Sequence, residues 1–150
     1  MMIHGRSYEV EVRVVIPFKG CHGLPMRPET HDHDWEAEFS VSGPLDPGTG
    51  MVCDMLELTA FFSRFVKPLD GTNLHKFPDF QHGEGLIGVT RDYPTCDTLA
   101  HYFMWKSLPP FEAEPRFQGL RISQIKVSIF EPDAAEAWGH AIIRPTSGQN

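Results

Sequence analysis

The chain has 150 residues and a formal net charge of −7 at pH 7, from 13 lysines and arginines against 20 aspartates and glutamates. This balance argues against a nucleic-acid-binding protein, because binding to phosphates requires a basic surface that releases counterions. Hydrophobic residues make up 41% and charged residues 22% of the chain, which is typical of a globular protein and excludes wholesale disorder. The length predicts a single domain over residues 1–150.

The cysteines and the hydropathy pattern bear on the compartment. Cys21, Cys53 and Cys96 cannot all pair, and their spacing matches no zinc ribbon or disulfide framework. Reduced thiols are typical of a cytosolic protein. No apolar run approaches the roughly 18 residues of a membrane span, and residues 1–6 lack the apolar part of a signal peptide. We therefore expect a cytoplasmic protein with no nucleic-acid or membrane partner.

The first half of the chain predicts two strands and a helix. Alternation of valine and isoleucine with charged residues predicts a strand over residues 7–18, which the segment 20–25 is expected to break. A second strand is predicted over 31–42, before a stretch dense in glycine and proline. Asp54 is positioned to cap a helix over 55–67 with a broad apolar face.

The second half predicts a long loop, a helix and two more strands. Residues 69–93 are rich in glycine, and loops of this length usually serve a site or are mobile. A helix is expected from Thr95 or Cys96 to Lys106, ended by the following pair of prolines. Strands are predicted over 120–130 and 138–143. The order β-β-α-α-β-β favours an α+β fold, with a four-stranded antiparallel sheet and two helices on one face.

Three histidines form the most distinctive local feature. His31 and His33 are two residues apart on a strand, so both imidazoles project from one face. His22 follows the strand that a hairpin would place alongside. Zinc is bound by imidazole nitrogens in tetrahedral sites, and three ligands leave the fourth position for water or substrate. We interpret the three as a metal site, and the alternative is a solvated strand face.

Several segments around these histidines occur together in one known family. They are FKGCHGL and HDHDW at residues 18–24 and 31–35, GMVCD at 50–54, LDGTNL at 69–74, PTCDTLA at 94–100, and Glu131 at a strand end. In these segments and their order the chain resembles the 6-pyruvoyltetrahydropterin synthase and 6-carboxytetrahydropterin synthase family. The resemblance extends over roughly residues 10–141.

The resemblance implies a fold, an assembly and a set of ligands. The fold would be the T-fold (tunnelling fold), with subunits assembled as two stacked trimers in a homohexamer. The histidines would hold zinc, and the substrate would be a pterin, 7,8-dihydroneopterin triphosphate in the family. Glu131 would hydrogen-bond the pterin ring, because a carboxylate can accept two N–H groups from such an edge. Thr95 and Asp97 would help to seat the ligand, with Asp97 standing where glutamate is usual. The alternative for Glu131 is a surface carboxylate.

Two departures from the family pattern affect the chemistry. The family has a cysteine as general base shortly before the histidine pair, but residues 24–30 contain none. Glu29 is the obvious substitute, since burial can raise the pKa of a carboxylate into the range of a base; the alternative is a solvated loop charge. The catalytic Asp-His pair becomes Asp70-Gly71, which leaves His75 as a candidate relay and His82 or His101 as more distant ones.

These observations predict a zinc-dependent lyase that acts on a dihydropterin. The product would be a 6-pyruvoyl, 6-carboxy or side-chain-cleaved pterin. The first alternative is a non-catalytic, zinc-containing T-fold protein that binds a pterin or purine, which the missing cysteine and histidine favour. The second is a zinc-stabilised domain with an unrelated small-molecule substrate. A catalytic thiol at Cys96, near a helix N-terminus, is a further possibility beside the simpler reading of a buried apolar group.

Overall fold

The structure is a computed structural model that describes residues 2–24, 27–80 and 94–146. The regular elements follow the chain as β1 (Met2–Ile3), β2 (Arg6–Ser7), β3 (Val10–Leu24), β4 (Arg27–Gly43), α1 (Met55–Val66), β5 (Thr72–Asn73), α2 (Cys96–Ala113), β6 (Arg121–Phe130) and β7 (Gly139–Ile143). Short 3₁₀ turns cover Lys67–Leu69, Leu74–Lys76, Pro78–Phe80 and Pro115–Phe117. The described helices include none that is long and apolar enough to cross a membrane.

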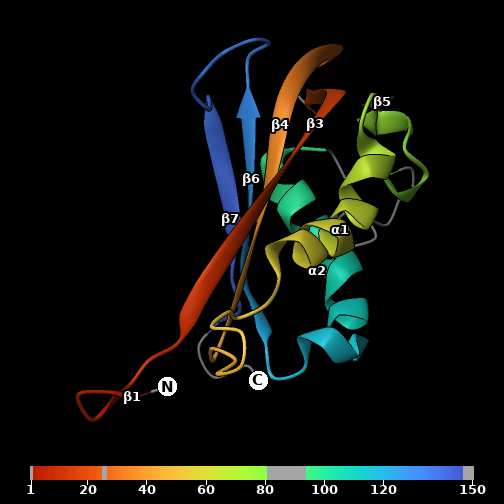
Figure 1. Ribbon diagram of the computed structural model, residues 1–150. Coiled ribbons are helices and arrows are strands. Elements are labelled where there is room, and N and C mark those ends of the chain that lie inside the picture. Colours follow the sequence, from red (N-terminus) through yellow and green to blue (C-terminus); the bar gives the residue numbers. More distant parts are fainter. Residues whose placement is uncertain (1, 25–26, 81–93, 147–150) are drawn as a thin grey trace.

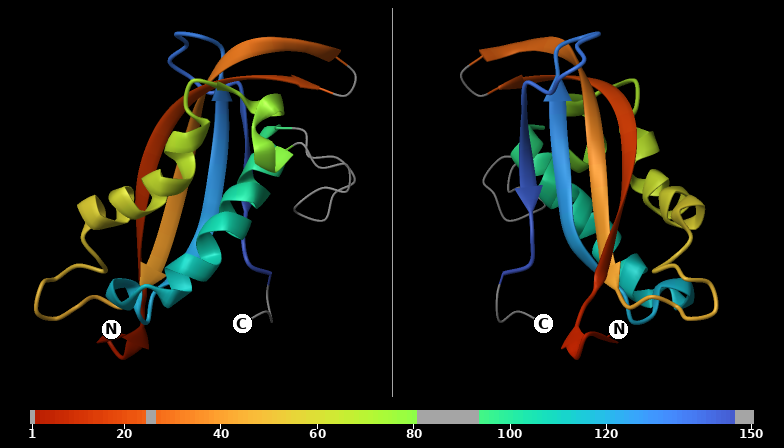
Figure 2. Two further views of the ribbon diagram at one scale, coloured as in Figure 1. Left: turned by 90° about the vertical axis from the view of Figure 1, so that its right-hand side faces the viewer. Right: turned by 60° about the vertical axis from the view of Figure 1, so that its left-hand side comes forward.

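One sheet and two helices make up the body of the molecule. The strands lie in the order β5-β3-β4-β6-β7, antiparallel throughout except that β5 runs parallel to β3. Both helices cover the same face of this sheet (Figures 1 and 2), which confirms the predicted α+β fold. The prediction of four strands is wrong by one, because two residues after α1 pair with the outer edge of β3. The small hairpin of β1 and β2 precedes the sheet.

The core lies between the helices and the inner face of the sheet. Alternate residues of β4, from Trp35 to Val41, are almost completely buried, as the predicted period of two requires. Phe39 stacks on Phe62 of α1 at 4.1 Å between ring centroids and meets Phe103 of α2 edge-on. Aromatic residues of the two helices thus join both to the central strand, and burial of such side chains is the main stabilising term.

The strand β3 continues through the segment that was expected to break it. Gly20 and its neighbours extend the strand to Leu24, opposite an equally long β4, with an irregularity in the pairing between His22 and Leu24. A Cβ atom at Gly20 would lie 3.0 Å from the side chain of Leu74, so glycine here permits a close approach between segments. The Trp35 indole N–H also donates to the Gly20 carbonyl at 3.1 Å. The prediction of a loop at this point was therefore wrong.

The second helix also passes the point where it was expected to end. Asp54 caps α1 as predicted, but α2 runs through Pro109 and Pro110 to Ala113. A proline inside a helix removes a hydrogen bond and costs about 3 kcal/mol. Beyond the prolines Phe111 is buried and stacks on Phe117 at 5.1 Å, so the packing of the last turn opposes this cost.

The segment 69–93 is only partly a loop. Its described part, up to residue 80, forms 3₁₀ turns and β5, and buries Leu74 and Phe80. The expectation of an irregular segment is therefore wrong for these residues, and residues 81–93 lie outside the described part. The last two strands were predicted to within one residue of their observed bounds.

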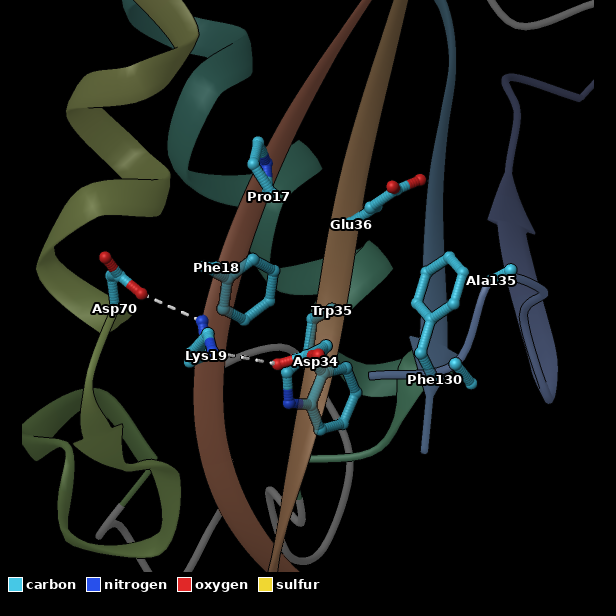
Figure 3. A pocket seen from close by; sticks show the side chains of 10 residues that line it. Pro17, Phe18, Lys19, Asp34, Trp35, Glu36, Asp70, Phe130 and Ala135 are labelled. Carbon is cyan, nitrogen blue, oxygen red and sulfur yellow. Dashed lines mark hydrogen bonds and ion pairs between the residues drawn. The ribbon is translucent and has the colours of Figure 1, made fainter. Parts of the chain in front are cut away.

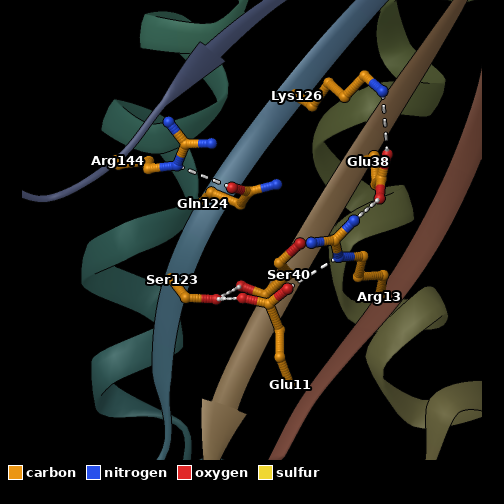
Figure 4. Close-up of polar contacts among 8 residues, drawn as sticks. All are labelled: Glu11, Arg13, Glu38, Ser40, Ser123, Gln124, Lys126 and Arg144. Carbon is orange, nitrogen blue, oxygen red and sulfur yellow. Dashed lines mark hydrogen bonds and ion pairs between the residues drawn. The ribbon is translucent and has the colours of Figure 1, made fainter.

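The sheet face opposite the helices is polar. Glu38 lies between Arg13 of β3 and Lys126 of β6, with N–O distances of 3.6 and 4.0 Å (Figure 4). Glu11 accepts hydrogen bonds from Arg13 and from the Ser123 hydroxyl at 2.8 Å each. This face therefore carries a band of charged groups that are paired across neighbouring strands.

Candidate functional site

Three imidazoles meet at one end of the helix-covered face. His22 of β3 and His31 of β4 are directly paired residues, and His33 follows two residues along β4 on the same face. The ring centroids are 4.7 Å apart for the first pair, 5.0 Å for His22 and His33, and 4.6 Å for His31 and His33. One nitrogen from each ring lies within 4.8 Å of the other two. The long β3–β4 hairpin thus brings together the three residues that the sequence singled out.

In two of these rings, a hydrogen bond to a backbone carbonyl determines which nitrogen can bind a metal ion. The Nδ1 atom of His22 lies 2.7 Å from the Pro94 carbonyl, and that of His33 lies 3.0 Å from the Phe130 carbonyl. A carbonyl can only accept, so each Nδ1 carries the proton and each Nε2 offers a lone pair. Both Nε2 atoms are buried and lack a hydrogen-bond partner among the described residues. Two orphaned lone pairs beside a third imidazole fit a metal ion.

Burial also favours the neutral, metal-binding form of His22. Its pKa is lowered to about 4, chiefly by desolvation, and further by the neighbouring imidazoles of His31 and His33. The hydrogen bond to Pro94 opposes this shift without cancelling it. His22 is therefore uncharged at neutral pH, as a ligand of a cation must be.

Two of the hollows beside the histidines share His31 and Trp138 in their walls. The first has a volume of about 400 Å³ and the second of about 300 Å³. The first is lined by His22, His31, Thr95, Cys96, Asp97, Ile129, Trp138, Gly139 and His140. The second is lined by Glu29, Thr30, His31, His33, Glu131 and Trp138. Four of the predicted site residues therefore line the hollows beside the histidine cluster: Glu29, Thr95, Asp97 and Glu131.

The first turn of α2 forms one of these walls. The Thr95 hydroxyl accepts from the Thr98 backbone N–H at 3.2 Å, and the Thr98 hydroxyl accepts from the Thr95 N–H at 2.9 Å. This reciprocal pair is a capping box, which fixes the start of the helix. Burial, aided by the neighbouring Asp97 carboxylate, raises the pKa of the Cys96 thiol to about 12. The thiol is therefore protonated at neutral pH, which disfavours a catalytic thiolate here.

Asp70 lies in a different hollow. This hollow, of about 480 Å³, has Lys19 and Asp34 in its wall (Figure 3). The Asp70 carboxylate accepts from the Lys19 backbone N–H at 2.8 Å. Gly71, where the family has histidine, donates to the Lys19 carbonyl with a φ of +75°, a conformation that favours glycine. The structure does not bring Asp70 to either hollow at the histidines, and its catalytic role stays a prediction.

His75 lies against the strand end that carries His22. Its Nε2 atom accepts from the Gly23 N–H at 2.6 Å and lies 3.1 Å from the Gly23 carbonyl. Its own backbone N–H donates to the Asn73 side chain. Of the two more distant candidates, His101 is exposed on α2, and His82 lies outside the described residues. His75 thus contacts the backbone beside a candidate metal ligand and lines neither hollow, and its catalytic role stays a prediction.

Sequence reasoning missed Trp138 and His140 as members of the site. Both reach it because β7 pairs with β6, which aligns Gly139 with Ile129. The Trp138 ring lies parallel to that of His33, at 6° and 6.2 Å between centroids. Their position in the sequence could have indicated this, because both residues follow the turn after Glu131, which is itself a predicted site residue.

Comparisons with known proteins point to one family. The model of the 6-pyruvoyl tetrahydropterin synthase family matches residues 16–138. A 6-pyruvoyl tetrahydrobiopterin synthase from Poecilia reticulata is 32% identical over 101 residues, and the chain spans 63% of that relative's length and 63% of its own.

Solved structures share the fold at low sequence identity. The 6-pyruvoyl tetrahydropterin synthase of Caenorhabditis elegans is 17% identical, with a TM-score of 0.66 over 94% of this chain and 99% of that one. A Plasmodium vivax 6-pyruvoyltetrahydropterin synthase, in a variant whose catalytic glutamate is replaced by cysteine, is 12% identical with a TM-score of 0.56, over 93% and 100%. The family model covers most of the chain, including all three histidines, so the chain belongs to the 6-pyruvoyl tetrahydropterin synthase family.

Proposed function

We propose that the protein is a zinc-dependent lyase that acts on a dihydropterin such as 7,8-dihydroneopterin triphosphate. The product would be a 6-pyruvoyl, 6-carboxy or side-chain-cleaved pterin. The observation that carries this proposal is the pair of buried Nε2 atoms of His22 and His33, which lack a partner among the described residues. His33 also lines a hollow together with Glu29 and Glu131. A metal ligand set next to two carboxylates can combine an electrophile, a base and a ring-binding group in one site.

His22, His31 and His33 would hold the metal. Zinc, when bound, polarises the side-chain oxygens of the pterin and lowers the barrier to removal of protons from the adjacent carbons. The hydrogen bonds from Nδ1 of His22 and His33 to backbone carbonyls orient both rings before a ligand arrives. Three protein ligands would leave a further coordination position for a substrate oxygen.

Glu29 is the proposed base and Glu131 the proposed ring-binding group. Glu29 lines the hollow of His31 and His33, and its carboxylate would take the proton from the carbon next to a side-chain hydroxyl. The Plasmodium vivax relative is described as having a catalytic glutamate, which supports a glutamate as base in a chain that has no cysteine at residues 24–30. Glu131 would accept two N–H groups of the pterin edge.

The remaining predicted site residues fall into two groups, those that line a hollow beside the histidines and those that do not. Thr95 and Asp97, at the wall formed by α2, would help to seat the substrate. The relay through Asp70 and His75 stays a prediction, since neither residue lines the hollows at the histidines. The homohexamer that the resemblance implies, and the cytoplasmic location expected from the cysteines and the hydropathy pattern, also stay predictions.

The test is anaerobic incubation of the zinc-loaded protein with 7,8-dihydroneopterin triphosphate, with products identified by mass spectrometry. We expect a new pterin, and a turnover rate that falls by a factor on the order of 10² to 10⁴ in Glu29→Gln. Glu112→Gln, an exposed glutamate of α2, is the matched control and should keep the wild-type rate. Unchanged substrate would contradict a lyase that acts on this pterin, and calorimetric binding without turnover would support the non-catalytic alternative.

A further inference from the structure

Trp138 is the most exposed tryptophan of the chain. Its relative exposure is 68%, against 47% for Trp105 and 1% for Trp35. Exposed tryptophan is unfavourable in water, and a large aromatic surface kept at a polar site is typical of a binding surface. Trp138 also lies outside the hydrophobic core, so the fold does not depend on its ring.

The ring is nevertheless held in one place. The Trp138 backbone N–H donates to the Ile129 carbonyl at 2.8 Å, which ties the residue to the end of β6. Its ring lies parallel to that of His33, within the distance range of offset stacking. With a relative exposure of 68%, the ring also stays accessible to a ligand. The ring therefore presents a fixed and accessible flat surface.

Trp138 lies between the two hollows of the site. Among the described residues, only His31 and Trp138 line both hollows. Glu131 lies at the other end of the same connection between β6 and β7 and lines one hollow with it. One end of this connection thus offers a carboxylate, which recognises the edge of a heterocycle, and the other offers an aromatic face.

We propose that Trp138 is a specificity-determining residue, the platform on which the flat conjugated ring of the substrate stacks while Glu131 binds the edge of that ring. This inference rests on the proposed function and adds the face-on contact that selects planar, conjugated substrates. Stacking between an aromatic side chain and a heterocyclic base is favourable for any ring with a π face, and specificity then follows from the hydrogen bonds at its edge. Trp138 acts by contact with the substrate and takes no part in proton transfer.

The test is binding of neopterin, a fluorescent pterin, to the zinc-loaded protein and to Trp138→Leu and Trp138→Phe. We expect the Kd to rise roughly tenfold to a hundredfold in Trp138→Leu, with a smaller rise in Trp138→Phe, because phenylalanine keeps an aromatic face. Trp105→Leu, which removes the other exposed tryptophan far from the histidines in the chain, should leave the Kd unchanged. Zinc content and sedimentation velocity of each variant are measured in parallel.

Each outcome bears on one of the two proposals. If wild-type protein binds neopterin and Trp138→Leu binds it equally well, the platform is overturned and the proposed function stands. If weaker binding in Trp138→Leu accompanies loss of zinc or a change in sedimentation, the platform is also overturned, since Trp138 would then support His33 or an interface between copies. If the wild-type protein does not bind neopterin, the proposed function fails and the platform fails with it.

Discussion

The two faces of the sheet differ in whether their polar groups are paired and exposed to water. On the face away from the helices, several charged groups of β3, β4 and β6 are paired and remain in contact with water, as for Glu38 with Lys126. On the helix-covered face, His22 and His33 are 3% exposed each, and their Nε2 atoms have no partner among the described residues. An unsatisfied buried polar atom costs about 1–3 kcal/mol, whereas an exposed ion pair contributes about 0–1 kcal/mol.

The difference distinguishes polar groups that are paired within the fold from polar groups that can bind a ligand. Ser40 Oγ is the third buried side-chain atom without a partner in the described part, but it stands alone, and nothing in the structure explains it. The two histidine nitrogens differ because they lie beside a third imidazole and face the same volume. Unpaired lone pairs that converge therefore indicate a site, and a single one does not.

The largest expected effect is the response of stability to zinc. Zinc at about 1,000 times its Kd should raise the free energy of unfolding by about 4 kcal/mol, because it binds the folded chain alone. In His31→Ala this gain should disappear, while the metal-free variant stays within about 0.5 kcal/mol of metal-free wild type, because His31 is exposed. Urea unfolding with and without a chelator measures both quantities, and an equal gain in His31→Ala would exclude it as a ligand.

Acid should destabilise the metal-free protein through His22. Its pKa is about 4 in the folded chain against an ordinary value of 6.5, so above pH 6.5 its contribution to stability is fully present. As pH falls from 6.5 towards 4, the unfolded chain binds the proton first, and about 2–3 kcal/mol of stability is lost. Urea midpoints of the metal-free protein from pH 7 to pH 4 measure this loss. In His22→Gln the urea midpoint should depend less on pH. If its pH dependence is unchanged, His22 is not the group that causes the loss.

A smaller effect is expected from His75. Its contact with Gly23 holds the strand end beside His22, so His75→Ala should weaken zinc binding by about tenfold, the lower end for outer-shell partners of metal ligands. His75→Gln supplies another acceptor for the Gly23 N–H and should restore part of the affinity. Competition with a zinc-binding dye measures the Kd. If both variants bind as wild type does, His75 does not position the ligand.

The smallest effect is expected on the paired face. Glu38→Gln keeps the shape of the side chain and removes its charge. It should change the free energy of unfolding by less than about 1 kcal/mol, since the partly buried Glu38 and its partners stay in contact with water and such ion pairs contribute little. Urea unfolding at low and high salt measures the change. A loss above about 2 kcal/mol would show that the charged band stabilises the sheet, and the contrast between the two faces would then be weaker than described.

Local patterns were enough to predict most of the elements and the histidine cluster. The alternation in 31–42 gave the buried face of β4, and the spacing of His31 and His33 placed both imidazoles on that face. Asp54 identified the start of α1 because capping is a local interaction. These predictions succeeded where the cause lies within a few residues of the effect.

Tertiary contacts decided the features that were mispredicted. Gly20 looked like a strand break, but it is the place where Leu74 approaches the sheet. Phe111 holds the turn beyond the prolines of α2 through contacts with Phe62 of α1 and with Phe117. Trp138 joins the site because β7 pairs with β6, a register that the sequence of either strand alone does not encode.

The hydrogen bond between His22 and the Pro94 carbonyl connects the histidine cluster to the start of α2. Pro94 directly precedes the capped first turn of α2, whose residues Thr95 and Asp97 line the first hollow. If a pterin binds against this turn and a metal ion binds His22, as proposed, the two ligands contact segments that this hydrogen bond joins. Any factor by which the metal changes the affinity for pterin must then equal the factor by which pterin changes the affinity for the metal, because coupling free energies are reciprocal.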